Sequence, residues 1–177
     1  MAKILIKGKR INLRTLRLSD ADSIKRHINS KGIVRYTQNI PYPYKRKQAV
    51  SFIRKSFTKI KKGTDYELGI ELNGEIIGGA SLLKIKDRIA EIGYWLGKRF
   101  WGKGYMTEAS KLIIEYGFNK LKLIRICSRV AGPNLASQRV LEKIGFKKEG
   151  IGRKQFFKNG KYYDEVRYGL LREEWNK

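Results

Sequence analysis

The residues most suited to chemistry form a short loop, Arg99-Phe-Trp-Gly102-Lys-Gly104. It stands between an apolar segment that ends at Gly97 and a stretch with the periodicity of an amphipathic helix. Glycine has no Cβ, so its backbone can come close to an oxyanion. The first N–H groups of a helix also lack carbonyl partners and carry partial positive charge. The loop is therefore predicted to hold the pyrophosphate of a ligand.

Two other phosphate-binding loops do not fit this spacing. A Walker A loop has Gly-Lys followed by Ser or Thr, whereas Gly104 follows Lys103 here. A dinucleotide fingerprint needs a small residue three positions after Gly104, where Thr107 stands, and an acidic residue at the end of the next strand. The next predicted strand, 123–130, has Arg129 near its end instead. Both alternatives are rejected.

The remaining pattern resembles the acyl-CoA loop of the GNAT superfamily of N-acetyltransferases. Asn134-Leu-Ala-Ser137, followed by Gly145-Phe146, resembles the second cofactor segment of that family. Ile40-Pro-Tyr-Pro-Tyr44 resembles its acceptor-side entrance. The similarity runs over nearly the whole chain and is greatest to the ribosomal-protein N-terminal acetyltransferase (RimJ/RimL-type) branch.

The periodicity of apolar residues predicts an α/β chain of mixed α+β order. Alternating or continuous apolar segments predict strands at 11–18, 66–72, 75–83, 89–97 and 123–130. Helical spacing predicts helices at 46–60, 105–119 and 134–144, and an earlier helix with Ala21, Ile24 and Ile28 on one face. Asn73-Gly74 and Asn159-Gly160 predict hairpin turns. The resemblance implies a GNAT fold, with a mostly antiparallel twisted sheet of about seven strands, a parallel splayed pair and about four helices. A single acetyltransferase domain spanning 1–177 is expected.

The resemblance also implies a cofactor, acetyl-CoA, and direct attack of a bound amine on its thioester. Three residues are expected to be catalytic: Ser137 at the sulfur, Asn134 at the pantetheine or the amine, and Glu91 as a base acting through water. The expected cofactor-binding residues are Trp95, Leu96, Gly97, Arg99, Gly102, Lys103, Gly104, Tyr105, Met106, Asn134, Ser137 and Lys143. Structural roles stay open for three of them, since Asn134 suits a helix cap, Ser137 a first helical turn and Glu91 an ion pair.

One position departs from the family pattern. Some ribosomal-protein acetyltransferases have a glutamate on the strand that follows Glu149-Gly150, but this chain has Gln155 there. A terminal α-amine has an ordinary pKa of about 7.7 to 8.0, against about 10.4 for lysine, and needs less help to lose its proton. A weak base therefore favours an α-amine acceptor.

Positive charge is concentrated in the first third of the chain. Residues 1–62 hold 18 Lys and Arg against two acidic residues, so that they carry +16 of the formal net charge of +24. In the resembling family this third helps to build the acceptor side. The surplus therefore favours acidic peptides, RNA or ribosome association and disfavours polyamines, unless it reflects a general surface composition.

The predicted function is acetyl-CoA-dependent transfer of an acetyl group to the N-terminal α-amine of a protein or peptide, of ribosomal-protein type. The alternatives are a small-molecule amine acetyltransferase and a non-catalytic RNA-binding or CoA-sensing module. The sequence predicts no metal site, no membrane partner and a cytoplasmic location, the last consistent with its one cysteine, Cys127. Monomer and homodimer stay open.

Overall fold

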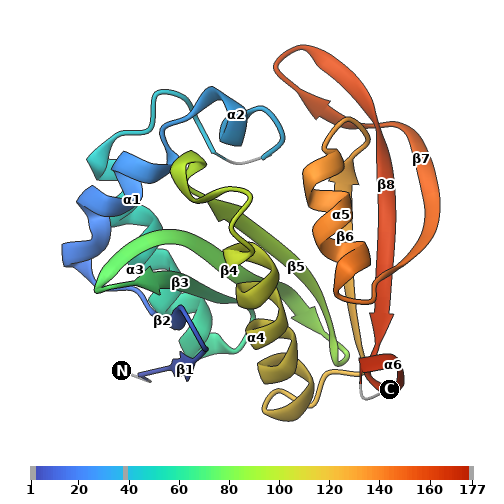
Figure 1. The fold of residues 1–177 in the computed structure, drawn as a ribbon, viewed down its shortest axis with the longest axis horizontal. Coiled ribbons are helices and arrows are strands. Elements are labelled where there is room, and N and C mark those ends of the chain that lie inside the picture. Colours follow the sequence, from blue (N-terminus) through green and yellow to red (C-terminus); the bar gives the residue numbers. More distant parts are fainter. Residues whose placement is uncertain (1–2, 38–39, 176–177) are drawn as a thin grey trace.

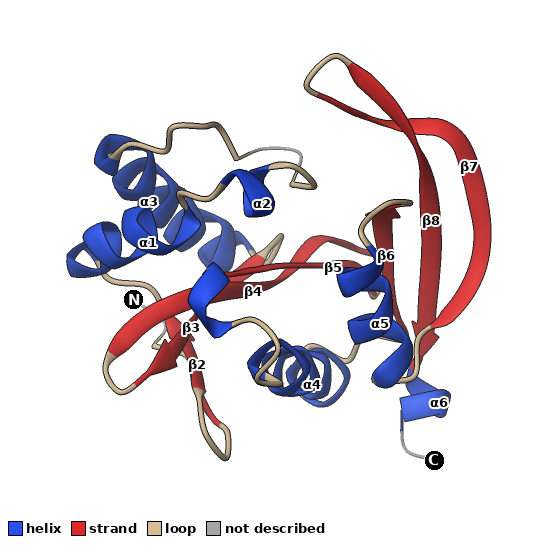
Figure 2. Ribbon diagram, turned by 45° about the horizontal axis from the view of Figure 1, so that its top comes forward, coloured by secondary structure: helices blue, strands red, loops and turns tan. Residues whose placement is uncertain are grey.

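The computed structural model describes residues 3–37 and 40–175. They form one sheet with helices on both faces (Figures 1 and 2). The sheet order is β1-β2-β3-β4-β5-β6-β8-β7. The strands are β1 (Leu5–Lys7), β2 (Asn12–Thr15), β3 (Tyr66–Leu72), β4 (Glu75–Lys86), β5 (Ile89–Leu96), β6 (Arg125–Ala131), β7 (Lys147–Lys158) and β8 (Lys161–Leu171).

The helices fall into two long ones and several short ones. They are α1 (Ala21–Ile28), α2 (Lys31–Val34), α3 (Arg46–Lys62), α4 (Tyr105–Asn119), α5 (Leu135–Lys143) and α6 (Arg172–Trp175), with 3-10 turns η1 (Leu18–Asp20) and η2 (Lys98–Phe100). The mixed α+β class is confirmed. The structure has more strands and helices than predicted. The additional elements are the three-residue strand β1 and the four-residue helices α2 and α6, which are too short to show a periodicity in the sequence.

The long helices α3 and α4 lie where apolar spacing predicts them. Helix α4 has the predicted bounds, and α3 extends the predicted helix by two residues to its left-handed cap at Gly63, φ +72°. Both hairpin turns have positive φ at their two central residues, as in Asn73 (φ 51°) and Gly74 (φ 82°). This is the backbone of a type I′ turn, which Asn-Gly pairs favour.

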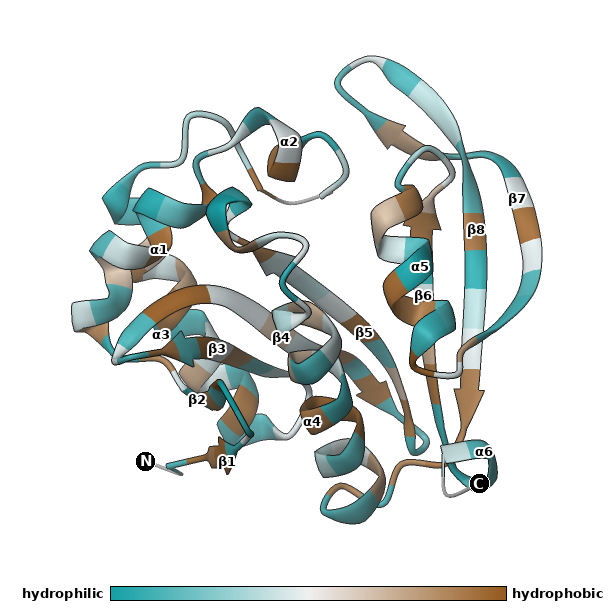
Figure 3. Ribbon diagram, in the orientation of Figure 1, coloured by the Kyte–Doolittle hydropathy of each residue, from teal (hydrophilic) through white to brown (hydrophobic). Residues whose placement is uncertain are grey.

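The two faces of the sheet carry different helices. Leu68, Ala80 and Ile92 pack in one hydrophobic cluster with residues of α4 and α5, whereas Trp95 packs with α1 and α3 in another. Because neighbouring strand residues point to opposite faces, even-numbered residues of β5 face α4 and odd-numbered ones face α3. Figure 2 shows α1 and α3 on one side of the sheet and α4 on the other, and Figure 3 shows apolar segments gathered along its central strands.

Strands β5 and β6 form the parallel pair of an otherwise antiparallel sheet. They pair only from Ile89 to Glu91, opposite Arg125 to Cys127, and no pairing is found beyond. Past this point the strands part, as the resemblance implies. Residues from both faces of the sheet near this opening, such as Tyr94 and Trp95 of β5, line one cavity.

Candidate active site

The predicted phosphate loop joins the end of β5 to α4 and is held in place at both ends. Gly102 (φ +74°) and Gly104 (φ +78°) have left-handed backbones, which side chains with a Cβ adopt only with strain. The indole Nε1 of Trp101 donates a hydrogen bond of 2.7 Å to the carbonyl of Leu96, the last residue of β5. Loop and strand end are therefore a single unit.

The N–H groups of this loop are not used by the protein. In the described part of the chain, the backbone N–H groups of residues 102–106 donate to no backbone or side-chain acceptor. A Cβ placed on Gly102 would meet no atom within 4 Å, so there is open space beside the loop. A run of unpaired amides at a helix N-terminus, next to open space, suits a bound pyrophosphate.

Arg10 supports the loop, and sequence analysis missed it. Its guanidinium Nη1 donates to the carbonyl of Lys103 at 2.9 Å, and its Nε pairs with Glu108 of α4 at 2.8 Å. It also lies over the ring of Tyr105, 4.9 Å from the centroid. Arg10 is nearly a hundred residues from these partners in the sequence, so that no local pattern could have predicted the contact.

Of the three basic side chains expected at the phosphates, Arg99 is paired within the protein, and Lys103 and Lys143 are exposed. Arg99 lies turned toward Glu75, with an N–O distance of 3.0 Å, and its Nη2 is 3.3 Å from Nε2 of His27. Lys103 and Lys143 are exposed, the second in the last turn of α5. Lys103 lies between the two glycines of the loop and is exposed to solvent. Arg99, in contrast, is paired with Glu75 within the protein.

A pair of hydroxyl groups lies at the opening between β5 and β6. Tyr94 Oη is 2.8 Å from Ser137 Oγ and 3.2 Å from the carbonyl oxygen of Ser137. Burial raises the pKa of Tyr94 to about 12. The hydroxyl of Tyr94 therefore keeps its proton at neutral pH. Sequence analysis did not single out Tyr94, because the contact joins a strand to a helix 43 residues away.

Asn134 and Glu91 both line the same cavity as this pair and already have protein partners. The side chain of Asn134 accepts a hydrogen bond from the N–H of Ser137 at 3.3 Å, as a helix cap does. Glu91 pairs with Lys84 at 3.0 Å and with Arg129 at 2.9 Å. Burial opposes the charged form of Glu91, but the hydrogen bonds from these cations outweigh it and lower its pKa.

The cavity has a volume of about 640 Å³ and spans both sides of the opening. On one side are Tyr94, Asn134 and Ser137, and on the other are residues of α3 and the Ile40 to Tyr44 segment. Trp95, also in the lining, packs with the cluster of α1 and α3. The carboxylate of Glu67, on β3, is nearly buried here, with one oxygen 3.3 Å from Lys59 Nζ and the other without a hydrogen-bond partner among the described residues.

The family model described as "Acetyltransferase (GNAT) domain" matches residues 10–147. The chain belongs to the GNAT acetyltransferase family. It is therefore an N-acetyltransferase of the GNAT fold, and the unpaired amides at 102–106 and the open space beside Gly102 fit the pyrophosphate of acetyl-CoA. Acetyl-CoA is its acetyl donor.

Among three curated relatives of this chain, two are named for different acceptors. "Putative ribosomal N-acetyltransferase YdaF" from Bacillus subtilis (strain 168) is 41% identical over 62% of this chain and 61% of its own length. "Probable N-acetyltransferase YjcK" from the same organism is 35% identical over 94% of this chain and 97% of its own. The spermidine N(1)-acetyltransferase of Escherichia coli (strain K12) is 27% identical over 93% and 88%. The relatives therefore leave the acceptor unresolved.

Solved structures of GNAT proteins share the whole fold. A "Probable acetyltransferase" crystal structure is 32% identical, covers 97% of this chain and 99% of that one, and has a TM-score of 0.87. The microcin C7 self-immunity acetyltransferase, in complex with acetyl-CoA and AMP, is 26% identical, with 93% of both chains covered and a TM-score of 0.85. RimL, the ribosomal L7/L12 alpha-N-protein acetyltransferase in complex with CoA, has the same fold at 20% identity, with a TM-score of 0.89 over 95% of this chain and 98% of that one.

Within residues 3–37 and 40–175, no helix is long and apolar enough to cross a membrane. The same residues contain no group of three or more His, Cys, Asp or Glu side chains that could hold a metal ion.

Proposed function

We propose that this GNAT enzyme transfers the acetyl group of acetyl-CoA to the N-terminal α-amine of a protein or peptide. The observation that carries this proposal is the state of Glu91, which lines the cavity but is held by two cations that lower its pKa. A carboxylate of low pKa is a weak proton acceptor, so the acceptor must be an amine that is already partly neutral. An α-amine fits this requirement, whereas a lysine side chain does not.

Glu67, the other carboxylate of the cavity, does not replace Glu91 as the base. Burial raises the pKa of Glu67, which would suit a base, but its free oxygen has essentially no exposed surface. Glu67 pairs in register with Ser81 of β4, and Ser81 with Gly93 of β5. Two strand spacings, about 9.6 Å in all, thus separate its backbone from β5.

The hydroxyl pair supplies the proton that the departing thiolate needs. When bound, acetyl-CoA would supply a thioester whose C–S bond breaks after the amine attacks its carbonyl carbon. Ser137 Oγ would donate its proton to the departing sulfur and regain one from Tyr94 Oη, to which it is hydrogen-bonded, while the proton lost by the amine passes to the water beside Glu91 and, through solvent, restores the hydroxyl pair. The raised pKa of Tyr94 keeps this donor protonated throughout the neutral range. Tyr94 therefore joins Ser137 and Asn134 in the proposed catalytic set, and Glu91 orients water beside the amine.

The cofactor is proposed to lie along the β5 end and the loop. The amides of residues 102–106 hold the pyrophosphate, and Asn134, whose side-chain oxygen caps α5, has its amide nitrogen available to the pantetheine. Lys103 and Lys143 add positive charge from exposed positions. Arg99 contributes to the phosphates only if it leaves Glu75, so its part is the smallest among the loop residues.

A small polyamine is the second candidate acceptor, since one relative is named a spermidine acetyltransferase. The formal charge of +24 works against such a cation. Ribosomal proteins are proposed as acceptors from the name of the YdaF relative, and binding of RNA by the basic first third stays a separate proposal.

The test is CoA release from acetyl-CoA with a panel of short peptides, the same peptides blocked at the α-amine, and spermidine. We expect turnover with free α-amines and none with blocked peptides that retain lysine. Ser137→Ala and Tyr94→Phe should lower kcat and leave acetyl-CoA binding nearly unchanged, since neither side chain holds the pyrophosphate. Turnover with spermidine alone would overturn the α-amine proposal.

A further inference from the structure

Five charged residues of the described chain line the cavity, and four of them are neutralised by protein partners. Lys59 pairs with Glu67 at 3.3 Å and with Asp65 at 3.7 Å. Arg129 pairs with Glu91. The side chain of the fifth residue, Lys55, has no ion pair or hydrogen bond to any residue that the structure describes.

Lys55 stands on the wall of the cavity that belongs to α3. Gln48, Ser51, Lys55 and Lys59 all line the cavity and follow one another at three- or four-residue steps. Residues at these steps lie on one face of a helix, so α3 presents a polar stripe to the acceptor side. Lys55 carries the one uncompensated charge on this stripe.

The same positive charge continues outside the cavity. A shallower hollow on α3 shares Ser51 and Lys55 with the cavity and is otherwise lined by Arg46, Lys47, Val50 and Arg54. Only Arg46 among these cations has a carboxylate partner in the described chain, Asp22 at 3.0 Å. A polypeptide that leaves the cavity past Lys55 therefore meets further positive charge.

We propose that Lys55 determines acceptor specificity by pairing with a carboxylate next to the reacting amine, so that the enzyme selects peptides with an acidic residue close to the N-terminus. This inference rests on the proposed α-amine function. Glu67 is the competing group, because its unpaired oxygen would favour a cationic acceptor. That oxygen is shielded from solvent, and Lys59 already balances the charge of Glu67, whereas Lys55 is exposed.

The experiment compares kcat/KM for two peptides that differ at the second residue, one with Asp and one with Lys, together with spermidine. The variants are Lys55→Glu and, as a control, Lys61→Glu. Lys61 lies on the same helix, is exposed and lines neither hollow, so the control makes the same change in net charge without touching the cavity.

We expect kcat/KM of the wild-type enzyme to be about tenfold higher for the Asp peptide than for the Lys peptide. The reason is that Lys55 attracts the carboxylate of the first peptide and repels the ammonium of the second in a partly enclosed site. Lys55→Glu should reverse this order through KM, whereas Lys61→Glu should leave the ratio within about twofold. If Lys55→Glu and Lys61→Glu changed the ratio of kcat/KM for the Asp and Lys peptides equally, the preference would come from the overall charge of the protein. That result would overturn the inference.

The two proposals fail in different ways. Turnover of both peptides with no effect of the second residue would overturn the role of Lys55 and leave the α-amine function standing. Turnover of spermidine alone, or of no acceptor in the panel, would overturn both. A melting temperature of Lys55→Glu equal to that of the wild type shows that the variant is folded.

Discussion

Gly102 and Gly63 have nearly the same backbone but different surroundings. Their φ angles are +74° and +72°, and a Cβ at either would meet no atom within 4 Å. Gly63 ends α3, where its N–H is bonded to the carbonyls of Ile60 and Lys59. Gly102 instead lies in the run of unpaired amides before α4. The same substitution at the two glycines therefore distinguishes the effect of backbone strain from an effect on cofactor binding.

We therefore predict different outcomes for Gly102→Val and Gly63→Val. A β-branched residue is strained in the left-handed region and costs each variant about 1 to 2 kcal/mol of stability. Only Gly102→Val shifts the amides and fills the space beside them, so it should weaken acetyl-CoA binding by tenfold or more, about 1.4 kcal/mol. Isothermal titration calorimetry with acetyl-CoA measures this. Equal affinities for Gly102→Val and the wild type would show that the loop does not hold the cofactor.

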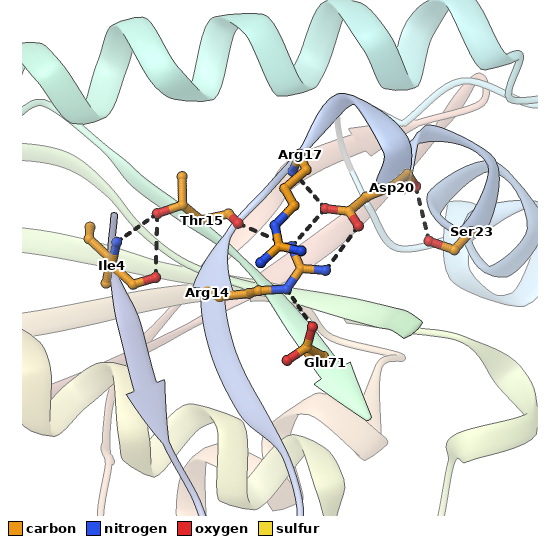
Figure 4. A network of polar contacts seen from close by, with 7 residues as sticks. All are labelled: Ile4, Arg14, Thr15, Arg17, Asp20, Ser23 and Glu71. Carbon is orange, nitrogen blue, oxygen red and sulfur yellow. Dashed lines mark hydrogen bonds and ion pairs between the residues drawn. The ribbon is translucent and has the colours of Figure 1, made fainter. Parts of the chain in front are cut away.

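At the scale of elements, a buried network of ion pairs fixes the start of α1, the helix that packs against α3 on the acceptor side of the sheet. Arg14 of β2 donates to both oxygens of Asp20, at 2.8 and 2.9 Å, and to Glu71 of β3 at 2.6 Å (Figure 4). Asp20 also accepts from the N–H of Arg17. Both side chains of the Arg14–Asp20 pair are less than a tenth exposed. The network joins two strands to the turn that begins α1, and α1 in turn packs against α3 in one hydrophobic cluster.

Removal of one partner should therefore cost much more stability than loss of a surface pair. Asp20→Ala leaves the buried guanidinium of Arg14 half-paired, and we expect a loss of about 3 to 5 kcal/mol in the free energy of unfolding. Asp22→Ala is the matched control, because its pair with Arg46 is more than half exposed, and it should cost less than about 1 kcal/mol. Urea unfolding of the two variants gives the comparison, and similar losses would contradict the assigned role of the network.

For the whole molecule, acidic groups are few and most of those with shifted pKa values are stabilised as anions. A hydrogen bond from His27, with weaker help from Arg99 and Arg26, lowers the pKa of Glu75 below its ordinary 4.5. A hydrogen bond from Arg125 does the same for Glu149. A group with a lowered pKa contributes stability above its unfolded-state value, and this contribution is lost as pH falls through the folded-state value.

We accordingly predict that the melting temperature stays nearly level between about pH 5.5 and 7.5 and falls steeply below about pH 4.5. Protonation removes the anionic partners while 40 Lys and Arg remain charged, so repulsion adds to the loss. Added salt at about pH 3.5 should restore part of the stability by screening. Scanning calorimetry across this range checks the prediction, which an unchanged melting temperature at low pH would refute.

The sequence by itself determined the features that depend on neighbours along the chain. Gly102 and Gly104 before an amphipathic stretch predicted both the loop and the bounds of α4, and Asn73-Gly74 predicted its hairpin. These succeed because turn conformation and helical periodicity are local properties. The family resemblance added the splayed parallel pair, which the pairing of β5 and β6 confirms.

Tertiary structure alone decided which partners the site residues have. The contact of Tyr94 with Ser137, the two cations on Glu91, the turn of Arg99 toward Glu75 and the unpaired state of Lys55 all depend on strands and helices far apart in the sequence. The physical reason is that hydrogen bonds and charges act across space over a few ångströms, and residue spacing does not encode which segments the sheet brings that close.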